Sequence, residues 1–168
     1  MSVRSPAPGG LELVRALVNT LDVETGADSL DTPENRARFG LARDAVPDAR
    51  ELRESLRVVL LAHAGHPPHR AVTPLGELLA AAPLVVTVDD ADGSAALAPV
   101  REGLLAARVA AAVAEALVAG TWSRLKACEA VDCLWAYYDR SPAGRGRWCS
   151  MQVCGARAKM RRYRAKEA

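Results

Sequence analysis

The chain has 168 residues, half of them hydrophobic, and a net charge of only +2. That charge is unevenly distributed, because residues 140–168 carry nine Lys or Arg and one acid, a net +8, whereas residues 1–139 carry 13 Lys or Arg and 19 acids, a net −6. The apolar content is sufficient for a folded core, and no apolar run reaches the roughly 18 residues of a membrane span. Residues 1–10 also lack the apolar region of a secretory signal, so we expect a cytoplasmic protein with no membrane segment.

The first third of the chain reads as a series of helices. Residues 1–10 are polar with two prolines, and we expect them to be disordered. A leucine at every fourth position predicts a helix over 11–21. Thr32-Pro33-Glu34 combines a capping residue, a proline at the first helical position and an acid, which predicts a short helix ending near Gly40. A longer apolar periodicity predicts a helix over 48–64.

The pattern then changes from helix to strand and back. Thr73-Pro74 predicts another capped, short helix by the same chemistry. Residues 84–88 are rich in valine and predict a strand, with 94–100 as its partner across a turn. An alanine-rich helix is predicted over 101–119, ended by a glycine. Residues 11–120 therefore predict an α+β domain that is mostly helical with a small β-hairpin.

Four cysteines fall in the last 41 residues and form two pairs of equal spacing, Cys128-x4-Cys133 and Cys149-x4-Cys154. Four thiolates suit a tetrahedral metal ion, and we expect one zinc ion; iron, an iron–sulfur cluster or disulfides are the alternatives. A reducing cytosol argues against the disulfides. Because protein ligands fill all four positions, the zinc would be structural and not catalytic.

The residues around the cysteines predict a second, small domain over 121–168. Residues 134–138 are aromatic and predict a strand, and 147–149 would return beside it as the second strand of a hairpin. Ser150 is a good helix cap, and a helix is predicted over 151–166. Knuckle, hairpin and helix in this order form a zinc finger resembling a treble clef.

This second domain holds the predicted nucleic-acid contacts. Its basic residues are Arg145, Arg147, Arg157, Lys159, Arg161, Arg162, Arg164 and Lys166. Arginine can bond phosphate or guanine through two nitrogens, which favours a nucleic acid as the partner. We expect DNA; RNA is the second hypothesis, and a finger that serves only protein interaction is the third, with its basic helix docked on an acidic partner such as this chain's own N-terminal domain.

The last helix also has an apolar stripe, formed by Val153, Ala156, Met160 and Tyr163. We expect it to pack on the hairpin or on the N-terminal domain. Four aromatic side chains lie in or beside the hairpin: Trp135, Tyr137, Tyr138 and Trp148. They could stack on unpaired bases, but we expect them to fill the small core of the finger.

Two further groups of polar residues are candidates for binding. Asn19 and Thr20 lie on a helix with an apolar face, and they either line a ligand pocket or bond to a neighbouring loop. His63, His66 and His69 recur every three residues and could hold a metal, although we expect ordinary loop histidines. The sequence has no catalytic constellation, so we expect no enzyme. A homodimer and a small-molecule effector are both compatible with it.

Two stretches of the finger carry a recognisable pattern: Cys128-x4-Cys133-x-Trp135-x-Tyr137-Tyr138-Asp139, then Arg147-Trp148-Cys149-Ser150-Met151-x-x-Cys154-Gly155-Ala156-Arg157-Ala158-Lys159. This pattern resembles the CGNR zinc finger of bacterial regulators. The family is named after Cys-Gly-Asn-Arg, which here reads Cys154-Gly155-Ala156-Arg157, without the asparagine. A contact made by that asparagine in relatives would be lost in this chain.

The N-terminal part also resembles a known domain. The matching features are Leu17-Val18-Asn19-Thr20-Leu21, the Asp/Thr-Pro-Glu segment at 31–34, the helix at 48–64 and Ala81-Ala82-Pro83-Leu84. These resemble the ABATE domain, a stress-response regulator domain that usually precedes this finger. Together the two resemblances imply a bacterial transcription regulator that binds DNA through its finger and senses a ligand or dimerises through its N-terminal domain.

Overall fold

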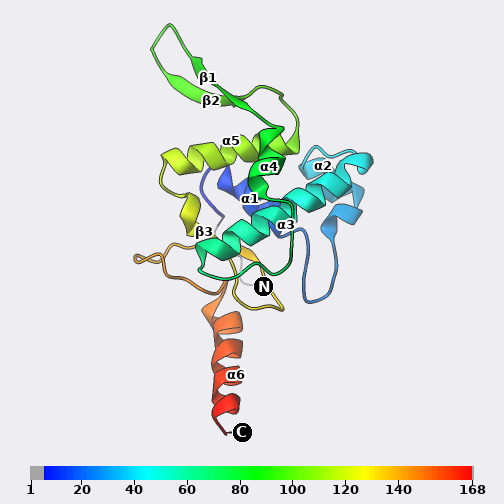
Figure 1. Ribbon diagram of the computed structural model, residues 1–168, viewed down its shortest axis with the longest axis vertical. Helices are drawn as coiled ribbons and strands as arrows, with labels where there is room; N and C mark the ends of the chain where they lie inside the picture. Colours follow the sequence, from blue (N-terminus) through cyan, green and yellow to red (C-terminus); the bar gives the residue numbers. More distant parts are fainter. Residues whose placement is uncertain (1–5, 168) are drawn as a thin grey trace.

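The structure, a computed structural model, describes residues 6–167 and has three parts (Figure 1). A helical body lies in the middle, a two-stranded hairpin extends from one end, and the C-terminal helix leaves the opposite end. The expected α+β class is confirmed. The helices are α1 (Leu11–Val18), α2 (Pro33–Arg38), α3 (Val46–His63), α4 (Leu75–Ala80), α5 (Leu105–Val118) and α6 (Ala156–Glu167), with single 3-10 turns at Ser29–Asp31, Arg43–Ala45 and Trp122–Arg124.

The core lies where α1, α3 and α5 meet. All three helices contribute fully buried side chains to it, among them Val14, Leu17, Leu56, Leu60 and Val109. All of these except Val14 are apolar periodic positions of the sequence; of the leucines at every fourth position in the first helix, Leu17 is buried and Leu13 only half-buried. The predicted helices over 11–21 and 48–64 are confirmed with small shifts at their ends. No helix within residues 6–167 is both long enough and apolar enough to cross a membrane.

The two predicted threonine caps have different outcomes. At α2 the hydroxyl of Thr32 accepts a hydrogen bond from the backbone N–H of Asn35 at 3.4 Å, as predicted. The helix is followed by Gly40 at φ +66°, a conformation that favours glycine. At α4 the prediction is wrong, because the Thr73 hydroxyl donates to Glu51 of α3 and no side chain caps the helix.

Residues 6–10 differ from the expected disordered terminus, of which residues 1–5 lie outside the described part. Ala7 is buried against the core, and its N–H donates to the Glu12 carboxylate at 2.7 Å. The carbonyl of Pro6 accepts from Arg140 of the finger at 2.6 Å. These contacts tie the start of the described chain to both domains.

The first sheet is the hairpin that extends from the body, made of β1 (Leu84–Val88) and β2 (Ala95–Pro99). The strands are antiparallel, with Val86 opposite Leu97, and the predicted hairpin is confirmed. Its side chains are largely exposed: Val86 is 69% and Val88 60% accessible. Helix α5 follows at Leu105, four residues later than predicted, after a turn in which Gly103 adopts φ +86°.

The second sheet is shorter and buried. Strand β3 (Leu125–Ala127) pairs antiparallel with β4 (Ala136–Tyr138), and β3 packs against α3. Leu125, Ala127 and Ala136 are 0% exposed and belong to the same core as α1, α3 and α5. The predicted pairing of 134–138 with 147–149 is therefore wrong: the aromatic strand pairs with a segment that precedes the cysteines. That segment contains a lysine and carries no clear strand signal.

Candidate metal centre and basic helix

The four cysteines come together where the short sheet meets the last helix. Cys128 follows β3 directly, Cys133 lies in the turn before β4, Cys149 ends an irregular segment, and Cys154 lies in a π-helical turn (Met151–Gly155) that leads into α6. Their four sulfur atoms all lie within 4.8 Å of one another. Zinc–sulfur bonds of about 2.3 Å in a tetrahedron place the sulfurs about 3.8 Å apart. The cluster has the dimensions of a closed four-thiolate site.

The groups around Cys128 favour its thiolate form. Hydrogen bonds from the thiols of Cys133 and Cys149 lower the pKa of Cys128, and backbone bonds from Cys149 and Ala130 add to this effect. The turn that brings Cys133 back is closed by its own N–H donating to the carbonyl of Ala130 at 2.8 Å. A thiolate is the form that binds a metal ion. The predicted cap is also present, since the Ser150 hydroxyl accepts from the N–H of Val153.

The short sheet is held to the helical body by side chains from α3 and the end of α1. The Asn19 amide makes two hydrogen bonds with the backbone of Ala136, at 2.9 and 2.7 Å. Arg57 is fully buried and donates to the carbonyls of Val18 and Leu134 at 2.9 and 3.1 Å. Asn19, one of the two candidate ligand residues, thus joins the two domains through backbone contacts.

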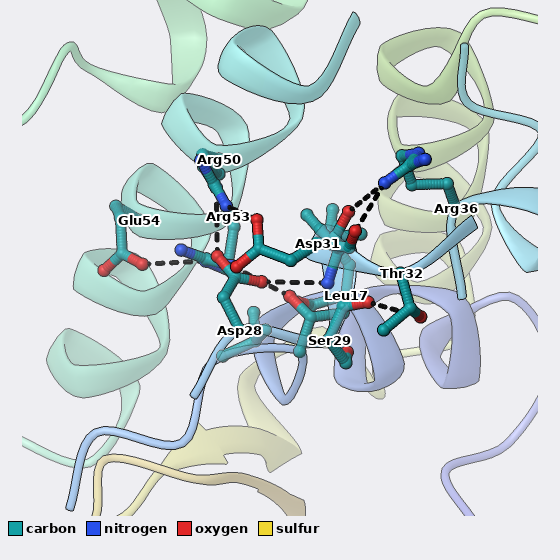
Figure 2. Close-up of polar contacts among 12 residues, drawn as sticks. Leu17, Asp28, Ser29, Asp31, Thr32, Arg36, Arg50, Arg53 and Glu54 are labelled. Atoms are coloured by element: carbon teal, nitrogen blue, oxygen red, sulfur yellow. Dashed lines mark hydrogen bonds and ion pairs between the residues drawn. The ribbon is translucent and has the colours of Figure 1, made fainter. Parts of the chain in front are cut away.

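Thr20, the other candidate, bonds to Arg53, which is part of a buried network of charges with Asp28 and Glu54 (Figure 2). Its hydroxyl accepts from Arg53 at 3.0 Å, and Arg53 also pairs with Asp28 and Glu54 at 2.8 Å each. Burial would raise the pKa of Glu54, but the positive charges of Arg57 and Arg53 lower it overall. The network fixes α3 against the loop that follows α1, which is a structural use of Thr20.

A second buried ion pair lies inside the finger and has no counterpart in the sequence-based predictions. Lys126 of β3 pairs with Asp139 at 2.8 Å, and each side chain is about 5% exposed or less. Burial alone would raise the pKa of Asp139, but hydrogen bonds from Lys126, Ser141 and the N–H of Gly146 hold it well below its usual range. The pair shapes the loop between β4 and Cys149. The sequence around Lys126 does not indicate that this lysine is buried, because β3 is only three residues long.

Family comparison confirms the two resemblances noted in the sequence. Residues 11–120 match the ABATE family, described as "Putative stress-induced transcription regulator". The chain belongs to this family. Residues 124–167 match the CGNR zinc finger, so the four clustered cysteines of the CGNR finger form the site of one zinc ion. No curated protein matches the chain.

The eight predicted nucleic-acid contacts of the CGNR finger are arranged in two ways. Three of them contact acids: Arg147 pairs with Glu129, Arg157 lies 3.5 Å from Glu24 and 3.8 Å from Asp132, and Arg161 lies 3.9 Å from Asp132. Glu24 belongs to the ABATE domain, so the base of α6 makes an ion pair with that domain. All three arginine side chains remain about half exposed.

The other basic residues extend into solvent. Those on α6 are Lys159, Arg162, Arg164 and Lys166, and all are exposed. None of them forms an ion pair with a side chain that the structure describes. Arg145 is also exposed but lies in the loop before Cys149, off the helix. The structure therefore gathers six of the eight predicted basic residues on one helix of the CGNR finger.

The apolar stripe of α6 differs from its predicted packing. Val153, Met160 and Tyr163 are 48%, 51% and 58% exposed, and Ala156 is exposed as well. The helix points away from both the ABATE domain and the short sheet, so neither covers the stripe (Figure 1). The predicted apolar face is present, but nothing within residues 6–167 buries it.

The aromatic residues of the CGNR finger mostly serve packing, as we expected. Tyr137 is buried and donates its hydroxyl to the carbonyl of Gly146 at 2.7 Å, and Tyr138 packs on the main core. Trp148 is half-buried beside the cysteines, with Arg147 over its ring at 5.1 Å. Trp135 is also half-buried. The part of Trp148 that stays accessible lies close to Arg161 and Arg162.

The three histidines do not converge on one site. His63 bonds to the carbonyl of Leu125 at 2.8 Å, whereas His69 bonds to Glu54 at 3.0 Å. His66 lies 3.8 Å from Glu129. Within residues 6–167, the cysteine cluster is the group whose ligand atoms converge as a metal requires.

Proposed function

We propose that this protein is a DNA-binding transcription regulator whose CGNR finger presents α6 to duplex DNA. The ABATE family description supports a role in regulation. The observation that carries the DNA contact is the position of α6, which stands clear of the body with six basic residues between 156 and 166 and no acid among them. Phosphates attract such a helix from either side, because its basic residues surround it.

The acids at the base of α6 do not oppose this role. Ion pairs between half-exposed side chains contribute about 1 kcal/mol or less, so a phosphate can replace Glu24 or Asp132 as the partner of Arg157. Before binding, these acids hold the side chains of Arg157 and Arg161 near the finger. The pairs therefore orient two arginines and do not neutralise the helix.

Zinc has a structural role in this proposal, because it would help to fix the position of α6. When bound, it would link the end of β3, through Cys128, to the π-helical turn that leads into α6, through Cys154. Asn19 and Arg57 fix the same sheet to the ABATE domain. The direction of α6 is thereby set relative to the whole body. We assign the chain no catalytic role.

Ligand sensing and dimerisation by the ABATE domain stay predictions. The polar groups of Asn19 and Thr20 are used within the chain, which favours a structural role for them. An apolar groove of about 840 Å³ lies between β2 and α5, lined by residues that include Leu97 and Val118. This groove is the better place to look for an effector or a second subunit. A regulator of this kind would act in the cytoplasm, as the sequence led us to expect.

The experiment that tests DNA binding is a salt titration. Affinity for a random-sequence duplex should fall linearly in log–log form with salt, and the Arg161→Ala/Arg162→Ala variant should reduce the slope by about one for each lost phosphate contact. The control is Arg70→Ala/Arg101→Ala, which removes two exposed arginines of the ABATE domain and should leave the slope unchanged. If single-stranded RNA binds more tightly than the duplex, the RNA alternative replaces this one. If neither binds at low salt, both are wrong.

A further inference from the structure

The uncovered apolar stripe of α6 is the feature that charge alone does not explain. A helix that only gathers phosphates needs no apolar face, and exposed apolar patches rimmed by polar residues mark interaction sites. Val153, Ala156 and Met160 line one shallow surface hollow, and its other walls come mainly from Arg157, Arg161 and Arg164. The stripe and the arginines therefore form a single contact surface.

The charges beside the stripe decide which kind of partner fits it. The spacing of Val153, Ala156, Met160 and Tyr163, three then four then three residues, would suit pairing with a second α6. However, such a pair would bring two helices with six basic residues each into contact, and no acid lies on 156–166 to offset them. A polyanion complements this surface, whereas a second copy of it repels.

Duplex DNA offers an apolar group to this surface in one place. The major groove is about 12 Å wide and takes one α-helix, and it exposes the C5 methyl group of thymine among its polar base edges. The minor groove shows no methyl group. An arginine-flanked apolar helix face therefore matches a major groove with thymines at its floor and phosphates on its walls.

The dimensions of the stripe agree with successive base pairs. Four residues of helix rise about 6 Å, and base pairs are stacked about 3.4 Å apart. Ala156 and Met160 thus lie about two base steps from each other along the groove. Ala156 occupies the position where the CGNR motif has asparagine, a residue that pairs with adenine, whereas alanine can offer only a methyl contact.

We propose that the apolar face of α6, centred on Ala156 and Met160, reads thymine methyl groups in the DNA major groove. This role rests on the DNA binding proposed above and adds a base preference to it. Arg157, Arg161 and Arg164 then flank the reading face, where they contact phosphates or guanine edges. Arg162 does not line the hollow that Ala156 and Met160 share, and it contributes charge without taking part in the reading.

The test uses uracil, which differs from thymine by that methyl group alone. A duplex is first selected from a random pool at physiological salt with the full-length, zinc-loaded protein, and each thymine is then replaced by uracil in turn. Affinity should fall about fourfold at each contacted position, the effect expected for one buried methyl group. The Met160→Gln variant should lose this discrimination at one or two positions while keeping the wild-type salt slope. The Arg162→Ala variant should weaken the thymine and uracil duplexes equally.

Each result has one meaning. Equal affinity for thymine and uracil at every position, with a normal salt slope, overturns base reading by the stripe and leaves DNA binding intact. No duplex binding at low salt overturns the proposed function itself. If the protein instead associates with itself without DNA and Met160→Gln abolishes that association, the stripe is a helix–helix interface and the reading role is wrong. Because Met160 is exposed, circular dichroism should show an unchanged fold in the variant.

Discussion

The two small sheets of this protein have opposite positions in the fold. The β1–β2 hairpin has five residues in each strand, a valine-rich first strand and an exposed surface. The β3–β4 pair has three residues in each strand, yet its side chains lie in the common core with α1, α3 and α5. The sheet with the stronger strand sequence is therefore the one that contributes less to the core.

This difference shows that the boundary between the two family domains is not a boundary of the core. The CGNR match begins at residue 124, but β3 and β4 pack inside the helical body as if they belonged to the ABATE domain. Asn19 and Arg57 of the ABATE domain bond to the segment 134–136 of the finger. The part of the finger beyond β4 lies outside this common core. The metal site and the Lys126–Asp139 pair hold that part in place.

The largest effect that tests this comparison is removal of zinc. Structural zinc contributes on the order of 10 kcal/mol to the folding of isolated fingers. In the metal-free protein, hydrogen exchange should become fast in residues 140–155 but stay slow in β3 and β4, because Leu125 and Ala136 remain buried by the body. The Cys149→Ser variant should behave in the same way, with α3 as the internal control. Fast exchange in β3 and β4 would mean that the metal holds the sheet in place.

The next largest effect is expected for Arg57→Leu. This change removes a fully buried charge, leaves Glu54 without one of its partners and leaves the Leu134 carbonyl without its donor. Breaking a buried ion pair costs about 3 to 5 kcal/mol, which urea denaturation measures. Arg70→Leu is the matched control: Arg70 is exposed, 4.0 Å from Glu54, and its loss should cost less than about 1 kcal/mol. Equal losses in the two variants would contradict the role of Arg57.

The sequence predicted the elements whose signals are local. Leucine periodicity, the Thr32-Pro33 cap and the valine run each report on neighbouring residues, and α1, α2, α3 and the β1–β2 hairpin followed from them. The equal spacing of the cysteines likewise predicted the metal cluster. None of these predictions requires knowing which distant residues come into contact in the folded protein.

The parts that were missed depend on distant partners. Strand β3 is three residues long and includes Lys126, whose burial is possible only because Asp139 lies opposite. An apolar stripe predicts that a helix has a face to cover, but it cannot say what covers it, and for α6 that partner is not the body of this chain. The burial of Arg57 was missed for the same reason, since the carbonyl groups to which it donates come from α1 and from the finger.

A smaller effect is expected for Asn19→Ala, which cuts the link between α1 and β4. The change leaves the N–H and carbonyl of Ala136 without partners, and an unsatisfied buried group costs about 1 to 3 kcal/mol. Asn35→Ala is a suitable control, because the side-chain hydrogen bonds of Asn35 are exposed and stay within its own helix, to Thr32 and Arg38. Thermal unfolding should separate the two variants clearly. Similar melting temperatures for the two variants would show that Asn19 is not needed for stability. Asn19 would then again be a candidate for contact with a ligand.

The smallest effect is expected at the exposed hairpin. Val86→Thr keeps the shape of the side chain and its preference for strands, and since Val86 is 69% exposed the free energy of unfolding should change by less than about 0.5 kcal/mol. The same exchange at fully buried Val109 should cost about 1 to 3 kcal/mol, because it buries a hydroxyl without a partner. If Val86→Thr costs as much as Val109→Thr, the hairpin must be covered in solution. Sedimentation of the wild-type protein would then show whether a second copy covers it, in which case the difference between the two sheets belongs to the isolated chain alone.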